Sequence, residues 1–233
     1  MKSPKLCETT KLHYGEYLYK LVLSNQLNTI FRTELQRHGK LGFAKEQLNN
    51  LREKYIQGEP LEEQVYRTVR IIPNDDYLDA LDIYAVLKFG DDYKLRVDPW
   101  RRLSIYSNDK ELLKKITRKM RVSNLEFWEP ATESINALLN EKNIILVDTL
   151  PEMSIKVTLG TRSVDPSFAN WLKANTDKSR VGPIALASIE EGTYLNGLYF
   201  YIRDEKVLSL VNMMAGHNIR RIDKLVYKQN IDK

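Results

Sequence analysis

The pattern of apolar and polar positions predicts a strand followed by two helices in the first sixty residues. Residues 17–23 are rich in aromatic and β-branched side chains, which favour a strand. Apolar residues recur at helical spacing over 26–37, after the capping pair Ser24-Asn25. A second helix is expected over 43–56, because the segment Gly58-Glu59-Pro60 would end it. The chain therefore opens on one strand and two helices.

The middle of the chain predicts a three-stranded antiparallel meander. The apolar runs 82–89, 93–97 and 103–107 are separated by turn residues, and Gly90-Asp91-Asp92 is typical of a hairpin turn. Residues 61–72 leave a helix and a strand both open, since short apolar runs fit either.

The rest of the chain predicts helices and strands in alternation. Asn108 or Asp109 can cap a helix whose apolar stripe ends at Met120, and a strand follows near 125–128. Further along, helices are expected at 131–141, 166–175 and 205–215, strands at 144–149, 153–159, 199–202 and 222–227, and a loop at 180–183.

Two segments of the chain resemble one another without gaps. Residues 103–116 and 198–211 each read as a strand, an acidic cap and an amphipathic helix, and another strand follows each of them. Two such βαβ units build a ferredoxin-like or RNA-recognition-type sandwich. The alternative is that two unrelated strand-to-helix junctions converged on an aromatic strand and an aspartate cap. The matched pairs are Leu103 with Leu198, Tyr106 with Tyr201, Asp109 with Asp204 and Leu113 with Leu208.

These patterns predict an α+β fold. We expect a mainly antiparallel sheet with helices packed on one side, built from two βαβ (ferredoxin-like) units after a helical N-terminal region. The N-terminal strand and helices are expected over 1–75 and the sheet region over 76–233, with both parts forming one compact unit.

Composition places the chain among ordinary globular proteins. It has 233 residues, 42% hydrophobic and 29% charged, which excludes collagen, disulfide scaffolds and wholly disordered chains. Cys7 is the only cysteine, so no disulfide can form within the chain, and a cytoplasmic location is expected. The N-terminus lacks an apolar signal segment and no window approaches a membrane span, so no membrane partner is expected.

Basic residues gather on one predicted helix, although the net charge is only +5. Four of them, at 110, 114, 118 and 121, fall on the face opposite the apolar stripe. Basic side chains beside aromatic ones suit nucleic acid, because cations replace counterions and aromatic rings stack on bases. A solvated charged helix face is the alternative. The predicted nucleic-acid-binding residues are Arg96, Trp100, Arg101, Arg102, Lys110, Lys114, Arg118, Arg121, Arg220, Arg221 and Lys224.

These residues favour a non-enzymatic nucleic-acid-binding accessory protein for replication or assembly, with single-stranded nucleic acid as the preferred partner. The alternative is a structural or adaptor protein whose basic face binds an acidic protein partner. The overall texture resembles that of small virus-encoded proteins, and no motif identifies a family.

A metal-dependent phosphodiester enzyme is the third hypothesis. Gly90-Asp91-Asp92 resembles the metal-binding turn of viral RNA-dependent polymerases, and its aspartates with Lys94, or Asp204 with Lys206, would suit a nuclease. A polymerase also needs fingers and thumb domains, and turn or cap roles explain these aspartates more simply. The three histidines lack metal-ligand spacing, and no phosphate-binding loop or dinucleotide fingerprint occurs. No catalytic residue, metal or cofactor is therefore predicted.

Overall fold

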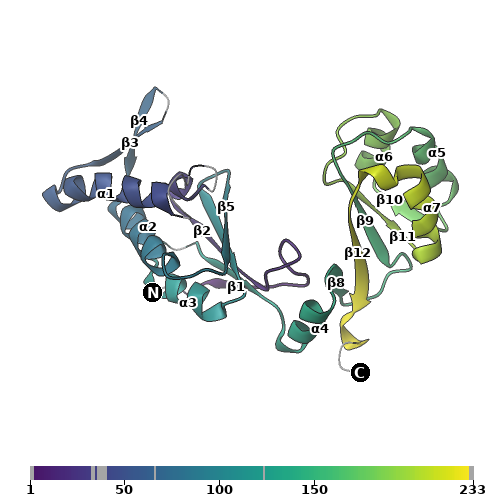
Figure 1. Ribbon diagram of the computed structural model, residues 1–233, viewed down its shortest axis with the longest axis horizontal. Coiled ribbons are helices and arrows are strands. Elements are labelled where there is room, and N and C mark those ends of the chain that lie inside the picture. The colour runs from purple at the N-terminus through teal and green to yellow at the C-terminus, as the bar shows by residue number, and fades with distance from the viewer. Residues whose placement is uncertain (1–2, 33–34, 36–40, 66, 123, 231–233) are drawn as a thin grey trace. The chain divides into compact units, whose positions relative to one another are not determined.

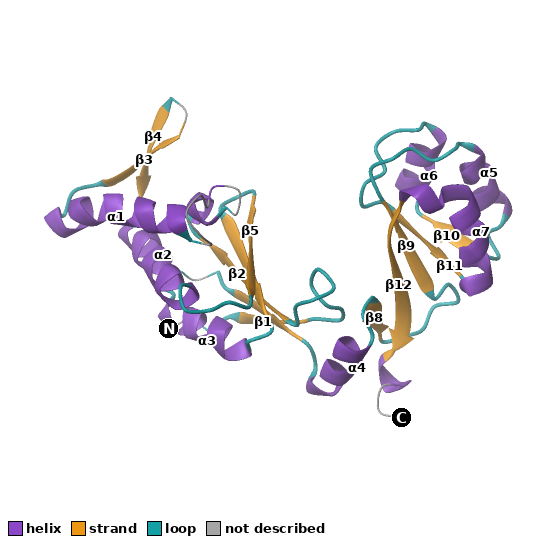
Figure 2. Cartoon of the chain, in the orientation of Figure 1, coloured by secondary structure: helices purple, strands orange, loops and turns teal. Residues whose placement is uncertain are grey.

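The chain folds into two compact units in the computed structural model, which describes residues 3–32, 35, 41–65, 67–122 and 124–230. Unit 1 comprises Met1–Thr9 and His13–Ala131, and unit 2 comprises Thr10–Leu12 and Thr132–Lys233. Each combines helices with a largely antiparallel sheet, so the expected α+β fold is confirmed (Figures 1 and 2). Among the described residues, every helix is too short or too polar to cross a bilayer.

Unit 1 is built on a five-stranded sheet in the order β1-β7-β2-β6-β5. β1 runs parallel to β7, and all the other neighbours are antiparallel. Its strands are β1 (Lys5–Glu8), β2 (Tyr19–Ser24), β5 (Tyr93–Asp98), β6 (Arg102–Ser107) and β7 (Glu126–Glu129). The other elements are the 3-10 turn η1 (Asn28–Phe31), the helices α1 (Gly42–Gln57), α2 (Asn74–Leu87) and α3 (Lys110–Lys119), and the hairpin β3 (Leu61–Val65) with β4 (Thr68–Ile72). The three helices lie on one side of the sheet (Figure 1).

The predicted strand at 82–89 is wrong, because these residues belong mostly to helix α2. Four side chains on one face of α2 are fully buried, and two aspartates occupy its first turn, where they suit the helix dipole. Gly90-Asp91-Asp92 therefore connects α2 to β5 and is not a hairpin turn. The buried residues are Tyr77, Ala80, Ile83 and Leu87.

Two other expectations in unit 1 are changed by the structure. The helix expected over 26–37 is reduced to η1 among the described residues, while 33–34 and 36–37 lie outside them. The division expected near residue 75 does not occur, because α2 begins at Asn74 and packs against both α1 and α3. The boundary lies after Ala131, and the chain forms two units where one was expected.

Unit 2 is built on a second five-stranded sheet, in the order β10-β11-β9-β12-β8. β12 runs parallel to β8, and all the other neighbours are antiparallel. Its strands are β8 (Ile144–Val147), β9 (Ile155–Leu159), β10 (Ser179–Val181), β11 (Tyr199–Ile202) and β12 (Ile219–Tyr227). Its helices are α4 (Ile135–Asn140), α5 (Ser167–Ala174), α6 (Pro183–Glu190) and α7 (Glu205–Ala215), with the 3-10 turns η3 (Thr132–Ser134), η4 (Gly216–Asn218) and η5 (Lys228–Asn230). The loop expected at 180–183 is instead the end of β10 and the start of α6.

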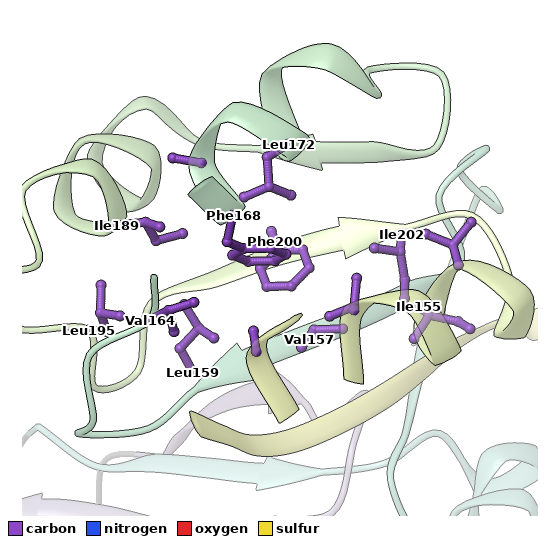
Figure 3. Packing of buried hydrophobic residues seen from close by; sticks show 14 residues of the cluster. Ile155, Val157, Leu159, Val164, Phe168, Leu172, Ile189, Leu195, Phe200 and Ile202 are labelled. Atoms are coloured by element: carbon purple, nitrogen blue, oxygen red, sulfur yellow. The ribbon is translucent and has the colours of Figure 1, made fainter. Parts of the chain in front are cut away.

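Three helices of unit 2 share one apolar core with the sheet (Figure 3). Phe168 of α5 packs edge-to-face on Phe200 of β11, with ring centroids 5.5 Å apart. Ile189 of α6 and Val211 of α7 are fully buried in the same cluster. Helices α5, α6 and α7 therefore all cover the same face of the sheet.

The two units repeat one topology. In chain order, strands β1, β2, β5, β6 and β7 of unit 1 correspond to β8, β9, β10, β11 and β12 of unit 2, with the same neighbours and the same strand directions. In each unit the last two strands are joined by a helix and flank the second strand. Antiparallel strands in this order form two overlapping split βαβ crossovers per unit.

The internal similarity seen in the sequence coincides with this repeat. Asp109 caps α3 by accepting a hydrogen bond from the Leu112 N–H at 3.0 Å, and Asp204 caps α7 by accepting one from the Val207 N–H at 3.0 Å. Segments 103–116 and 198–211 are thus equivalent strand–helix units, as predicted. The matched leucines differ in burial: Leu113 is fully buried, whereas Leu208 is only partly buried against the core.

Candidate nucleic-acid interface

Each sheet has one face covered by helices and an opposite face, which we call the outer face. Side chains alternate between the two faces along every strand. In unit 1 the Lys110 ammonium of α3 lies 5.8 Å from the centre of the Tyr19 ring, so α3 covers the Tyr19 side of β2. Lys20, the next residue, therefore points to the outer face, as does Lys156 of unit 2, which alternates with the core residues Ile155 and Val157.

The two outer faces share one arrangement of cations and tyrosines. In unit 1, Tyr106 lies between Lys20 of β2 and Lys94 of β5 in the strand register. In unit 2, Tyr201 lies between Lys156 of β9 and Arg180 of β10. Residues directly opposite in antiparallel strands share a face and touch. The structure therefore places a tyrosine between two cations at the same position of both sheets.

On the outer face of unit 1 the tyrosine is covered by an N-terminal loop. The Tyr106 ring contacts those of His13, Tyr14 and Tyr17, with centroids 5.5, 5.0 and 6.4 Å away, and only 4% of Tyr106 is exposed. The Lys94 ammonium lies 4.2 Å from the centre of the Tyr14 ring. Tyr14 is 47% exposed, so it is the ring of this cluster that a ligand can reach.

The cations on the outer face of unit 1 are partly neutralised. Arg96 pairs with Asp98 at 2.6 Å, and Arg102 pairs with Glu126 at 3.3 Å. Lys20 lies 5.4 Å from the centre of the Trp128 ring. Burial lowers the pKa of Lys20, an effect that Asp98 opposes.

On the outer face of unit 2 the aromatic rings are more accessible and the cations less neutralised. The Lys156 ammonium lies 3.7 Å from the centre of the Tyr199 ring, which is 44% exposed and 5.6 Å from the Tyr201 ring. Burial lowers the pKa of Lys156, the charges of Lys11 and Arg221 lower it further, and Asp223 opposes them. No carboxylate forms an ion pair with Lys156 in the part of the chain that the structure describes.

A cavity of about 930 Å³ adjoins this outer face. Cationic side chains from four places in unit 2 line it, Lys173 of α5 among them, together with one of the paired tyrosines and with apolar side chains. These include Lys11, Lys156, Arg180, Tyr201, Met153 and Leu225. The cavity can therefore accept a ligand with both a negative charge and a planar or apolar part.

Helix α3 carries the predicted basic residues, but carboxylates pair with them. Lys110 pairs with Glu129, Lys114 with Glu111 at 2.8 Å, and Arg118 with Glu111 at 3.8 Å. These cations lie on the helix-covered side of the sheet, away from Arg96 and Arg102. The structure thus separates the residues predicted in unit 1 into two groups on opposite sides of one sheet.

Arg121 lies beyond the end of α3 and contacts α2. Its guanidinium bonds to Asp79 and to Asp82, each at 3.0 Å, and Asp79 is fully buried. This contact fastens the chain after α3 to the core of unit 1, which is a structural role that charge patterning did not indicate.

The tip of the β5–β6 hairpin presents another predicted residue, Trp100, almost entirely to solvent. Trp100 is 90% exposed, and both it and Arg101 have positive φ, at 64° and 63°. Two successive positive φ values match the twist of a tight hairpin but are uncommon for bulky residues.

Arg220, Arg221 and Lys224, the predicted residues of unit 2, all lie on β12. Arg221 is on the outer face and bonds to the buried Asp223 at 2.6 Å, whereas Arg220 is exposed and donates to Asn196 at 2.9 Å. Lys224 is exposed and lies opposite Ile155.

The predicted binding residues did not include Lys156, Arg180 or Tyr199, because only strand pairing brings these side chains together. The internal repeat contained a signal, since it matched Tyr106 with Tyr201. Among the described residues no group of histidine, cysteine or carboxylate side chains could hold a metal ion, and Asp91 and Asp92 form no such group.

Comparisons with protein-family models, with curated proteins and with solved structures found no match. The description of the two units as ferredoxin-like stays a prediction, and their strand order and directions are the observation behind it.

Proposed function

We propose that this chain is a non-enzymatic accessory protein that binds single-stranded nucleic acid on the outer faces of its sheets. The observation that carries the proposal is the tyrosine held between two cations at the same register in both units. Aromatic rings on an open sheet stack on unpaired bases, and adjacent cations neutralise the backbone phosphates. Because Tyr106 is covered, the exposed ring of Tyr14 would do the stacking in unit 1, as that of Tyr199 would in unit 2. We also propose a cytoplasmic location, which is expected from the lone cysteine, Cys7.

The residues predicted from sequence contribute to the proposed interface to different degrees. Arg96, Arg102 and Arg221 lie on the outer faces, and Trp100 and Arg101 extend the face of unit 1 at a hairpin tip. The cations of α3 form local ion pairs, so a phosphate would have to compete with Glu111 and Glu129 for them. We therefore rank the outer faces above the helix.

The test is the affinity for a labelled single-stranded oligonucleotide, measured by fluorescence anisotropy over a range of salt concentrations. Tyr199→Ala should weaken binding about tenfold, which matches a lost stacking interaction of roughly 1–3 kcal/mol. Lys156→Gln should also weaken binding, because a cation that neutralises a backbone phosphate is lost. Lys156→Gln should also flatten the dependence of log K on log salt. Matched controls in the same unit are Tyr194→Ala, whose ring is 69% exposed, and Lys206→Gln on α7.

Three outcomes would contradict parts of the proposal. Unchanged affinity in both outer-face variants at low salt would remove the outer face of unit 2 from the site. A larger loss in the double variant Lys114→Glu, Arg118→Glu than in Lys156→Gln would return the site to α3. Binding to an acidic protein without binding to any oligonucleotide would favour the adaptor alternative.

A further inference from the structure

The cavity of unit 2 suits a more specific ligand than a continuous single strand. We propose that it binds a nucleotide phosphomonoester, that is, the terminal phosphate and adjoining base of a strand end or of a free nucleotide. This inference rests on the proposed function for its choice of a nucleic-acid ligand. The cavity volume of about 930 Å³ lies in the range of small-molecule sites, roughly 300–1,000 Å³.

The charge around the cavity favours a ligand with two negative charges. Lys11, Lys156 and Arg180 line it without a carboxylate partner in the described part of the chain, while a fourth lining cation, Lys173, pairs with Glu190. The acidic lining residue Glu152 already pairs with Arg203 at 3.0 Å. A phosphomonoester is close to dianionic at neutral pH, whereas an internal phosphodiester carries one charge. The Coulomb attraction to the three cations is therefore about twice as large for a terminal phosphate.

Two further observations favour an anion beside Lys156, although Arg221 itself does not line the cavity. Lys11 and Arg221 repel the charged form of Lys156, and only Asp223 opposes them, while it is already bonded to Arg221. The Nη2 atom of Arg221 is buried without a hydrogen-bond partner, so the positive charge beside Lys156 is incompletely compensated. A bound phosphate would relieve this repulsion.

The base has a surface on which to stack. Tyr201 lines the cavity next to Arg180 in the strand register, and the apolar side chains of Met153 and Leu225 complete the wall. A base held there would lie within one nucleotide of its own phosphate, because Arg180 and Tyr201 are directly opposite on neighbouring strands.

The experiment compares one oligonucleotide in three forms, with a 5′-phosphate, a 3′-phosphate or hydroxyls at both ends, and adds adenosine 5′-monophosphate and inorganic phosphate as free probes. We expect one phosphorylated form to bind about tenfold more tightly than the hydroxyl form at constant salt. Arg180→Gln and Lys156→Gln should abolish this preference. Lys206→Gln on α7, outside the cavity, should leave it unchanged, and thermal unfolding should show all three variants folded.

Free probes distinguish the two sources of the phosphomonoester. A nucleotide site is supported if adenosine 5′-monophosphate competes with the phosphorylated oligonucleotide. Its affinity should then be unchanged in Tyr201→Phe, which keeps an aromatic ring, and weakened in Tyr201→Leu, which lacks one. Inorganic phosphate that competes equally well overturns the part played by the base. Equal affinity for all three oligonucleotide forms overturns the inference while the proposed function stands. Binding of adenosine 5′-monophosphate that Arg180→Gln removes, without binding to any oligonucleotide, supports the cavity and overturns the proposed function.

Discussion

The contact between Asp79 and the chain after α3 allows a quantitative test of the role of Arg121. Asp79 is fully buried, and its carboxylate accepts hydrogen bonds from the backbone N–H of Arg121 at 2.9 Å, from that of Val122 at 3.1 Å, and from the Arg121 guanidinium at 3.0 Å. Replacing Asp79 by alanine leaves the two backbone donors without this acceptor, while the guanidinium keeps its bond to Asp82. Two backbone hydrogen bonds to a charged group are lost, each worth roughly 1.5–3 kcal/mol, so we expect a cost of about 3–6 kcal/mol.

Arg121→Ala should cost less, because both backbone donors still satisfy the carboxylate. We expect a loss of about 1.5–3 kcal/mol, the value of one hydrogen bond to a charged group, because the second lost bond, to Asp82, is exposed and contributes little. Asp79→Ala removes two backbone bonds and one guanidinium bond at a buried carboxylate, whereas Arg121→Ala removes only the guanidinium bonds to Asp79 and Asp82. Asp79→Ala should therefore be the more destabilising variant.

Hydrogen exchange followed by mass spectrometry measures this difference in unit 1 alone, on peptides that cover α2, α3 and β7. Denaturant unfolding gives a second measurement, provided that transitions of the two units are separated. The reasoning is refuted if Asp79→Ala leaves protection of these peptides unchanged, or if Arg121→Ala is the more destabilising variant. An oligonucleotide affinity that falls in Arg121→Ala without any loss of stability would instead restore Arg121 to the binding site.

Three further predictions concern the repeat and the outer faces. Leu113→Ala should cost about 2–5 kcal/mol, and Leu208→Ala should cost clearly less because Leu208 is only partly buried; equal costs in urea unfolding would contradict this. Burial and the neighbouring Tyr14 raise the pKa of Tyr106 to about 12. Between pH 10 and 12 the unfolded chain loses this proton more readily than the folded chain, so the free energy of unfolding should fall by up to about 3 kcal/mol more in the wild type than in Tyr106→Phe. Denaturant unfolding at each pH measures this difference. The pKa of Lys156 is lowered, so its charged form disfavours folding at pH 7. Lys156→Met should therefore raise the melting temperature at pH 7, and this gain should shrink as the pH rises toward 10.5. A melting temperature below that of the wild type at pH 7 would contradict this prediction.

Local patterns were sufficient for most elements of unit 2 and, in unit 1, for β2, α1, β5, β6, α3 and β7, but not for β1. The aspartate caps at 109 and 204 and the apolar stripes after them identified α3 and α7, because capping and helical spacing act within a few residues. The segment 82–89 was misread because its apolar residues suit either a strand or a helix. Only packing against α1 and α3 makes the helix the form that buries Tyr77 and Ile83.

The candidate site was less accessible to sequence reasoning than the fold. A basic stripe on one helix is visible within a dozen residues, but the carboxylates that neutralise it come from other elements, such as Glu129 of β7 for Lys110. The outer-face residues Lys156, Arg180 and Tyr201 lie on three strands and look unremarkable one by one.

The sequence by itself determined the α+β composition, the helix caps and the equivalence of two strand–helix segments, because these depend on spacing and on local hydrogen bonds. The tertiary structure decided that the chain forms two units of one topology, which cations keep carboxylate partners, and which tyrosines lie between cations. Strand register brings residues from distant parts of the chain within contact distance, and burial determines which of their charges stay uncompensated.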